Sequence, residues 1–139
     1  MTRHAVFSNA ARLREMGNAF ILAELKKAGL RGLAPSHGDV LACLLACEAC
    51  HMSELARQVR RSKSTLTALV EKLEKYGYVR RSVDPEDSRG VLVALTAKGR
   101  ALRPFFEAVS QRLEHMIAQK LSPEEINALD RLLAKCVQA

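Results

Sequence analysis

The chain of 139 residues contains no tryptophan, 4 phenylalanines and 2 tyrosines. Leucine and alanine are abundant instead, and this composition favours helices over extensive sheet. No apolar run approaches the ~20 residues that a membrane-spanning helix needs. The first residues also lack the apolar core of a secretory signal. We therefore expect a cytoplasmic protein with no membrane partner.

The sequence also lacks the short motifs of several enzyme classes. It contains no glycine-rich phosphate loop, no zinc-hydrolase motif and no nucleophile elbow. We therefore expect that the protein is not an enzyme and uses no cofactor. A thiol or metal enzyme is the alternative, because the sequence offers a group of cysteines and histidines. The candidates are Cys43, Cys47, Cys50, His37 and His51.

The cysteines have a simpler interpretation as packing residues. Without an export signal, the four cysteines are expected to be reduced thiols rather than disulfides. Cys43 and Cys47 lie in a segment whose leucines form a core stripe, where cysteine packs as a small hydrophobe. No second Cys-x-x-Cys pair completes a tetrahedral zinc site, so we expect no metal site. Oxidant sensing and metal binding stay open as alternatives, and Cys136 has no assigned role.

The positive charge is concentrated in one segment. Of the 22 lysines and arginines, 12 lie between Arg57 and Arg103, together with 5 of the 15 acids, so this segment carries the whole formal net charge of +7. Clustered cations attract phosphates, and a helix fits the major groove of duplex DNA. The charge distribution therefore indicates a partner that is double-stranded DNA.

Three helices are expected in the first part of the chain. Apolar residues recur at helical spacing over residues 8–27, and glycines and Pro35 follow that segment. Ser36 is the expected N-cap of a second helix that ends near Cys47. A short third helix is expected over residues 53–60.

The periodicity is sharpest in a fourth helix, whose expected N-cap is Ser62. Its inward face consists of Leu66, Leu69, Val70 and Leu73. Lysine, serine and threonine occupy the outer face, and Gly77 stands where a left-handed residue closes a helix. The third and fourth helices are therefore predicted to form a helix-turn-helix.

Two β-rich segments, residues 78–83 and 91–95, flank a turn sequence over residues 84–90. The hairpin would form the wing of a winged helix-turn-helix. Thr96 is expected to cap a long helix that bends at Pro104. Ser122 is expected to begin a last helix.

The predicted fold class is mainly α (α+β), a winged helix-turn-helix with N- and C-terminal dimerisation helices. The sequence contains no linker, no repeat and no low-complexity tract, so residues 1–139 are expected to fold together and not as two tethered domains. The terminal helices carry more apolar surface than a small winged-helix core can cover, which indicates a homodimer. The residues concerned are Leu113, Ile117, Leu121, Ile126, Leu129, Leu132 and Leu133.

Two stretches give the chain a specific resemblance. MSELARQVRRSKSTLTALVEKLEKYGYVRR and DPEDSRGVLVALTAKGRAL, with Asp87-x-Arg89 and Leu95-Thr96-x-x-Gly99, resemble the multiple-antibiotic-resistance regulator (MarR) family of bacterial transcription factors. This resemblance implies a DNA-binding lobe at residues 36–96 and a dimerisation region at residues 8–28 and 97–138. It also implies a homodimeric repressor on a pseudo-palindromic operator, released by a small effector, an oxidant or a metal. Ala68 departs from the family, in which many members carry a basic residue at this position.

The predicted DNA contacts lie on the fourth helix and on the hairpin. On the helix they are Ser62, Lys63, Ser64, Thr65, Thr67 and Lys72, since the first turns of such a helix enter the groove. Lys72 is assigned to a phosphate. A capped, solvated helix start is the alternative interpretation.

On the hairpin, Arg89 is expected to enter a minor groove from the tip, because a narrow groove attracts arginine. The resemblance to the family implies that Asp87 pairs with this arginine or supports the wing. Arg80 and Arg81 alternate along a strand, so at most one faces DNA, and Arg81 is the one we assign. A winged-helix interaction module with an incidental basic face is the remaining alternative, and it would not prefer a palindrome over random duplex.

Overall fold

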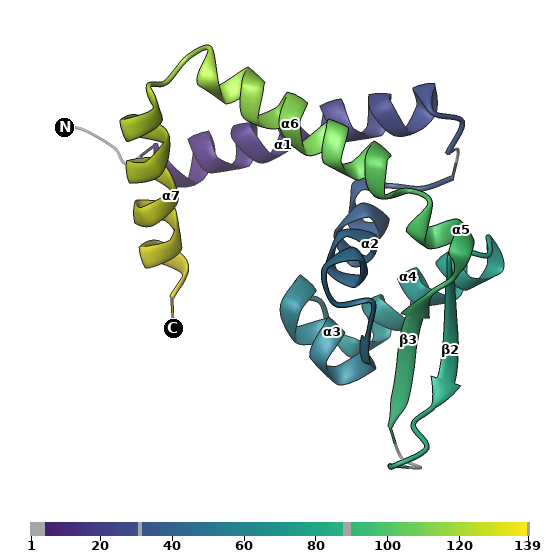
Figure 1. Cartoon of the computed structure of the whole chain (residues 1–139). Helices are drawn as coiled ribbons and strands as arrows, with labels where there is room; N and C mark the ends of the chain where they lie inside the picture. Colours follow the sequence, from purple (N-terminus) through teal and green to yellow (C-terminus); the bar gives the residue numbers. More distant parts are fainter. Residues whose placement is uncertain (1–4, 31, 88–89, 139) are drawn as a thin grey trace. The chain divides into compact units, whose positions relative to one another are not determined.

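The computed structural model describes residues 5–30, 32–87 and 90–138 (Figure 1). Its elements are α1 (Val6–Lys27), α2 (Pro35–Cys47), β1 (Ala49–His51), α3 (Met52–Val59), α4 (Lys63–Lys75), β2 (Val79–Val83), β3 (Val91–Leu95), α5 (Ala97–Arg100), α6 (Arg103–Ala118) and α7 (Pro123–Val137). The chain divides into two compact units, Met1–Phe106 and Glu107–Ala139. The predicted helix-turn-helix and hairpin both lie in the first unit.

The first unit contains a three-stranded antiparallel sheet in the order β1-β3-β2. β2 and β3 form the expected hairpin, with Val79 opposite Leu95 and Val83 opposite Val91. β1 is a strand that the sequence analysis did not predict. It places His51 opposite Leu92, near the outer end of the hairpin.

The core of this unit lies between α2, α3, α4 and the sheet. Its completely buried side chains include Leu41, Leu44, Leu55, Leu66 and Leu73. On α4, Leu66, Val70 and Leu73 are all 0% exposed, and Leu69 is half-buried against the same cluster. The inward face predicted for the fourth helix is thus confirmed. Burial of such side chains stabilises the fold by about 1.5–3 kcal/mol each.

Both ends of α4 are fixed as the sequence predicts. The Ser62 hydroxyl accepts a hydrogen bond from the backbone N–H of Thr65, at 3.2 Å. At the other end Gly77 adopts φ +85°, a left-handed conformation that glycine tolerates best. The N–H groups of Gly77 and Tyr78 donate to the carbonyls of Glu74 and Leu73, both at 2.9 Å. This pattern is the Schellman motif, which satisfies the last carbonyls of a helix.

The start of α2 differs from the prediction. Ala34, not Ser36, is the N-cap, and Pro35 is the first helical residue. Proline suits that position because its missing N–H would be unpaired there in any case. The side chain of His37 supplies the cap, since its Nδ1 accepts from the N–H of Ala34 at 2.9 Å.

The long helix expected after Thr96 is divided in two. Thr96 does cap α5, because its hydroxyl accepts from the N–H of Gly99 at 3.1 Å. α5 ends at Arg100, and α6 begins at Arg103 after a turn. Pro104 has no N–H to donate to the carbonyl of Arg100, so the chain turns and a new helix starts.

The second unit comprises the rest of α6 and α7. Ser122 and Glu125 form a reciprocal cap at the start of α7, with distances of 3.2 and 2.9 Å. This confirms the predicted start of the last helix. None of the helices in the described ranges is both long enough and apolar enough to cross a membrane.

Candidate nucleic-acid interface

α3 and α4 are joined by a tight turn of residues 60–62. Arg60 ends α3 in a left-handed conformation, with φ 56° and ψ 47°. The N–H of Arg61 then donates to the carbonyl of Ala56 at 3.1 Å. With Leu55 and Leu66 buried on either side of this turn, the two helices are held as a rigid pair. This is the helix-turn-helix that the sequence predicts.

The first turns of α4 present hydroxyl groups and one lysine to solvent. Ser62, Lys63, Ser64 and Thr65 are exposed, and Thr67 is half-buried. The hydroxyl of Ser62 donates to that of Thr65 at 2.9 Å. The hydroxyl of Thr67 donates to the backbone carbonyl of Lys63 at 2.8 Å, so its oxygen remains as an acceptor. These residues make the solvent-facing part of the first turns of α4 mostly polar.

Lys72 lies further along α4 and is half-buried. Its charge is close enough to His37 to contribute to the lowered pKa of that histidine, whose main cause is burial. Lys72 thus lies near the start of α2.

Arg81 on β2 is bound to α4 by an ion pair. Its Nε and Nη2 donate to Glu74 Oε1 at 3.1 and 2.9 Å, and its backbone N–H donates to Glu74 Oε2 at 3.0 Å. The side-chain hydrogen bond from Arg81 is the main reason that the pKa of Glu74 is lowered. Arg80, one residue earlier, is exposed and has no side-chain partner within the described ranges. The DNA contact assigned to Arg81 stays a prediction that competes with this internal pair.

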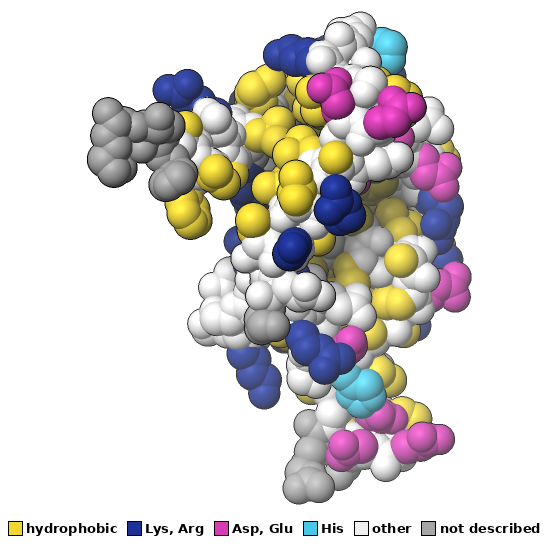
Figure 2. All heavy atoms as spheres, turned by 90° about the vertical axis from the view of Figure 1, so that its left-hand side faces the viewer, with side chains coloured by type: hydrophobic (Ala, Val, Ile, Leu, Met, Phe, Trp, Pro, Cys, Tyr) yellow, Lys and Arg dark blue, Asp and Glu magenta, His cyan; other side chains and the backbone are white. Residues whose placement is uncertain are grey.

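The turn between β2 and β3 is organised by Asp84. Its Oδ1 accepts from the N–H of Glu86 at 2.9 Å, and its backbone carbonyl accepts from the N–H of Asp87 at 3.2 Å. Asp87 is exposed and has an interaction partner. Figure 2 shows acidic side chains gathered at the lower edge of the view, with a histidine beside them. Arg89, the predicted minor-groove residue, lies outside the described residues.

His51 pairs with Asp84, with 2.9 Å between Nε2 and Oδ2. A pocket of about 220 Å³ lies beside this pair, and Lys63, Thr67 and Arg81 also line it. The start of α3, the first turns of α4 and the turn end of the hairpin therefore converge here. Sequence reasoning considered His51 as a metal or thiol-enzyme residue and missed this position, because it did not predict β1.

The junction after β3 supports α4 from behind. The hydroxyl of Thr96 donates to the carbonyl of Gly77 at 2.5 Å. Lys98 Nζ donates to the carbonyl of Tyr76 at 2.6 Å and lies 4.6 Å from the ring centre of Tyr78. Both cations and hydroxyls at the C-terminus of a helix complement its partial negative charge. The motif Leu95-Thr96-x-x-Gly99 thus acts on the end of the candidate recognition helix.

A larger pocket, of about 430 Å³, lies between α1 and the start of α2. Arg14 and Asn18 from α1, Ser36 from α2 and Arg61 line it. Arg61 Nη2 is 3.3 Å from Asp39 Oδ2. Arg61 Nε is buried and makes no hydrogen bond in the described part of the chain. Ala19, Leu22 and Pro35 complete the lining of the pocket, and its two arginines suit an anionic ligand.

The cysteines are divided between buried and exposed positions. Cys43 and Cys50 are partly buried against the core, whereas Cys47 and Cys136 are exposed free thiols. Burial, together with the neighbouring Cys47, raises the pKa of Cys43, and it raises that of Cys50 to about 12. The predicted packing role is confirmed for Cys43 and wrong for Cys47, which is the last residue of α2 and is exposed. Within the described ranges, no group of three or more His, Cys, Asp or Glu could hold a metal ion.

Known proteins resemble this chain in sequence. The model of the MarR family matches residues 33–91. The HTH-type transcriptional regulator SarZ of Staphylococcus haemolyticus is 33% identical over 89 residues, 63% of this chain and 60% of that protein. The HTH-type transcriptional regulator YcgE of Bacillus subtilis is 31% identical over 125 residues, 88% of this chain and 79% of that protein. The multiple antibiotic resistance protein MarR of Escherichia coli is 34% identical over 95 residues, 67% of this chain and 66% of that protein.

Solved structures share the fold over almost the whole chain. A cysteine-to-serine mutant of Escherichia coli MarR, complexed with operator DNA, has a TM-score of 0.86 at 23% identity, covering 96% of this chain and 94% of that one. Bordetella bronchiseptica BpsR, whose DNA binding is regulated by 6-hydroxynicotinic acid, has a TM-score of 0.84 at 24% identity, covering 97% of this chain and 100% of that one. This likeness confirms the predicted winged helix-turn-helix.

Proposed function

Because this chain belongs to the MarR family of transcriptional regulators, we propose that it is a homodimeric repressor that binds a pseudo-palindromic operator and is released by a small effector. The observation that carries the proposal is α4, which buries Leu66, Val70 and Leu73 completely and presents hydroxyls and Lys63 to solvent. A rigid helix with such a face fits the major groove. The segment around it carries the whole net charge of +7, which favours the phosphate backbone.

The contacts on DNA divide into three kinds. Ser64 and Thr67 are suited to read base edges, and the free acceptor of Thr67 matches the amino group of adenine or cytosine. Lys63 and Lys72 supply cations for phosphates. Arg89 enters the adjacent minor groove, and Asp87 supports the wing that carries it. On β2, Arg80 is exposed, whereas Arg81 is paired with Glu74. Arg80 is therefore the better candidate for a phosphate contact.

The proposed dimer uses the terminal helices. Residues 36–96 form the DNA-binding lobe, and residues 8–28 and 97–138 form the dimerisation region. Support comes from exposed apolar side chains on α1, which are Val6, Phe7, Leu13, Met16 and Leu22. Such a row is unusual on the surface of a monomer. Sedimentation at micromolar concentration should give a dimer, and a monomer would contradict this part of the proposal.

The proposed effector site is the pocket between α1 and α2. Two arginines, an amide and a hydroxyl suit a small carboxylate. Arg61 connects this pocket to DNA binding, because it immediately precedes Ser62, the N-cap of α4. 6-hydroxynicotinic acid, named for BpsR, is a carboxylate to use as the first probe. It should raise the melting temperature of the wild type and of Arg12→Gln, but not of Arg14→Gln, since Arg12 is on the same helix and does not line the pocket.

The function itself is tested by selecting bound sequences from random duplexes. A shared pseudo-palindrome should emerge, and affinity for it should exceed that for random duplex and fall steeply with salt. Equal affinity for every duplex would favour an incidental basic face instead. We propose that the protein has no catalytic activity, uses no cofactor and is located in the cytoplasm, in keeping with a regulator that binds DNA.

A further inference from the structure

Glu74 of α4 binds the backbone of β2 as well as a side chain on it. Its Oε2 accepts from the backbone N–H of Arg81 at 3.0 Å, and its Oε1 accepts from Nε and Nη2 of the same residue at 3.1 and 2.9 Å. The side-chain hydrogen bond is the main reason that the pKa of Glu74 is lowered, so the carboxylate is ionised at neutral pH. A flexible side chain can follow a moving partner, whereas a backbone N–H moves only with its strand. One carboxylate therefore fixes the position of β2 itself.

This contact lies where the hairpin leaves the hydrophobic core. Val79, Arg81 and Val83 share one face of β2. Their exposure rises along the strand, because Val79 is 2% exposed, Arg81 is half-buried and Val83 is 62% exposed. Val91, the partner of Val83 on β3, is exposed as well. Glu74 thus holds the hairpin at the point where burial of its valines ends.

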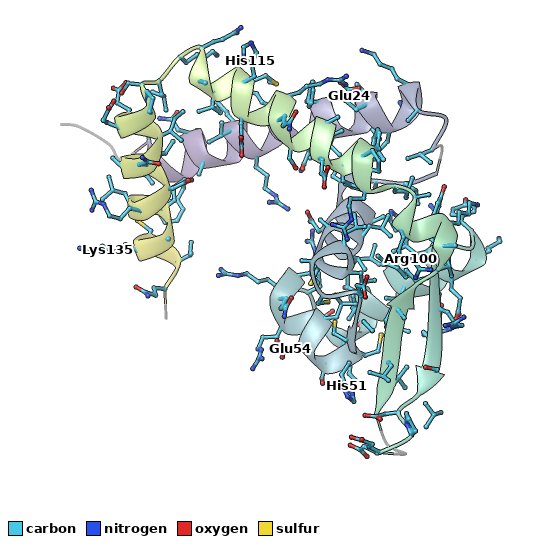
Figure 3. All side chains as sticks on the ribbon, viewed as in Figure 1. Glu24, His51, Glu54, Arg100, His115 and Lys135 are labelled. Atoms are coloured by element: carbon cyan, nitrogen blue, oxygen red, sulfur yellow. The ribbon has the colours of Figure 1, made fainter. Side chains whose placement is uncertain are left out.

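The turn of the hairpin has a separate tie, which goes to α3. His51 Nε2 lies 2.9 Å from Asp84 Oδ2, and Figure 3 labels His51 near the start of α3. The residues assigned to base edges lie on α4 instead. In the described residues, the hydrogen bonds between α4 and β2 all end on Glu74. The relation between the recognition helix and the wing therefore depends on this one side chain.

We propose that Glu74 is a positioning residue that fixes how many base pairs separate the bases contacted by α4 from the flank entered by the wing. The inference rests on the proposed DNA binding, and it adds a rule for the choice of operator. In that function α4 occupies a major groove and the wing an adjacent, narrow minor groove. A rigid joint between the two elements favours one separation over all others.

The size of one step along DNA shows that the joint cannot adapt. A flank displaced by one base pair lies ~3.4 Å further along the duplex and is rotated by on the order of 35°. A wing that followed it would stretch the bonds from Arg81 to Glu74, now 2.9 to 3.1 Å long, well beyond the ~3.2 Å limit of ordinary N–H···O bonds. The wild type should therefore keep the joint and lose the wing's contact with a displaced flank.

Glu71 provides the matched control. It lies about one turn before Glu74 on α4, and its Oε1 is 4.0 Å from Arg81 Nη1. Glu71→Gln removes the same charge as Glu74→Gln without removing a hydrogen bond to the backbone of β2. Glu74→Asp is the complementary variant. It keeps the charge, but its carboxylate is one methylene group shorter and falls short of the Arg81 N–H.

The experiment measures affinity by fluorescence anisotropy for the selected operator and for duplexes whose A/T-rich flanks are moved by one base pair. The wild type and Glu71→Gln should bind the displaced duplexes about five- to tenfold more weakly, the cost of losing one specific contact. In Glu74→Gln and Glu74→Asp the ratio should fall below about twofold. Each ratio compares two duplexes on one protein, so it does not depend on the fraction of that protein that is folded.

Two results would overturn the proposal. If Glu74→Gln keeps the wild-type ratio, another contact fixes the wing. If Glu71→Gln loses the ratio to the same extent as Glu74→Gln, the effect comes from charge and not from position.

A readout without DNA separates this proposal from the proposed function. Residual dipolar couplings of backbone amides report the orientation of the hairpin relative to α4. The couplings of Ser82 and Val91 should agree between the wild type and Glu71→Gln and be reduced by averaging in Glu74→Gln. Failure to bind any duplex while the couplings change in this way would reject the DNA-binding function and leave the hold of Glu74 on the wing intact. Equal couplings in the wild type and Glu74→Gln would reject that hold.

Discussion

The guanidinium of Arg81 and its backbone N–H both donate to the carboxylate of Glu74, at 2.9 to 3.1 Å, although the two residues lie on different elements. The Schellman turn at Gly77 makes this possible, because it reverses the chain and brings β2 back along the end of α4. The recognition helix and the wing are therefore oriented relative to each other by a specific polar contact. The same contact leaves Arg80 pointing to the opposite side of the strand.

The two neighbouring arginines should give different mutant phenotypes. Arg81→Ala leaves Glu74 unpaired, so it should lower the melting temperature and weaken DNA binding at every salt concentration. Arg80→Ala should leave the melting temperature unchanged and reduce the salt dependence of binding by about one phosphate contact. Thermal unfolding and anisotropy titrations at two salt concentrations distinguish them. The reverse pattern would show that Arg81 leaves Glu74 to contact DNA.

The lowered pKa of Glu74 predicts how acid affects stability. In the unfolded chain this carboxyl has its ordinary pKa of about 4.5, and pairing with Arg81 lowers the pKa in the folded protein. The pair therefore stabilises the fold above the ordinary pKa, and this contribution is lost as the pH falls through the lowered value. Urea unfolding should show the wild type exceeding Glu74→Gln in stability at about pH 6, with the difference shrinking toward pH 3. A constant difference would mean that the carboxylate contributes nothing as a charge.

Gly99 should be intolerant of any side chain. A Cβ there would overlap the carbonyl oxygen of Tyr78 and lie 2.9 Å from Leu95 Cδ2. Gly99→Ala should cost about 1–3 kcal/mol of unfolding free energy, the usual effect of overpacking. Gly17 is the control, because a Cβ at this helical position would meet nothing within 4 Å. Gly17→Ala should stabilise α1 by about 0.5–1 kcal/mol. Urea denaturation measures both, and equal effects would contradict the steric argument.

Much of the site was predictable because its signals are local. The cap at Ser62, the stripe from Leu66 to Leu73 and the stop at Gly77 each depend on residues within a turn or two of one another. The structure reproduces all three. Thr96 as a cap and the two strands of the hairpin belong to the same class of local signals.

The features that were missed depend on distant partners. β1 consists of Ala49, Cys50 and His51, which carry no strand pattern, and it forms because β3 offers an edge some forty residues later. The pairing of His51 with Asp84 could not be inferred without that strand. Cys47 was assigned to the core from its proximity to Leu44 and Leu45, but it is the last residue of α2 and is exposed.

The thiols should react in an order that follows exposure and pKa. Thiolates are the reactive form, so the raised pKa of Cys43 and Cys50 makes these two slow. Cys47 and Cys136 are exposed and should be alkylated first. Mass spectrometry after brief treatment with iodoacetamide tests the order. We also expect mild peroxide to leave operator affinity nearly unchanged, and release that is abolished by Cys47→Ser would show an oxidant sensor instead.

Two substitutions on α4 should distinguish a contact with a base from a contact with a phosphate. The Thr67 hydroxyl donates its proton to the carbonyl of Lys63, so toward DNA its oxygen is left as an acceptor, and the expected contact is directional and depends on the base. Thr67→Ala should relax the choice at one base pair of each half-site, by roughly 1–3 kcal/mol. Lys72→Ala should instead weaken all duplexes alike and flatten the salt dependence by about one phosphate contact. A panel of operators with single substitutions, titrated at two salt concentrations, measures both effects. If Thr67→Ala leaves the ranking of these operators unchanged, the first turns of α4 position the protein on the backbone, and the bases are read by other residues.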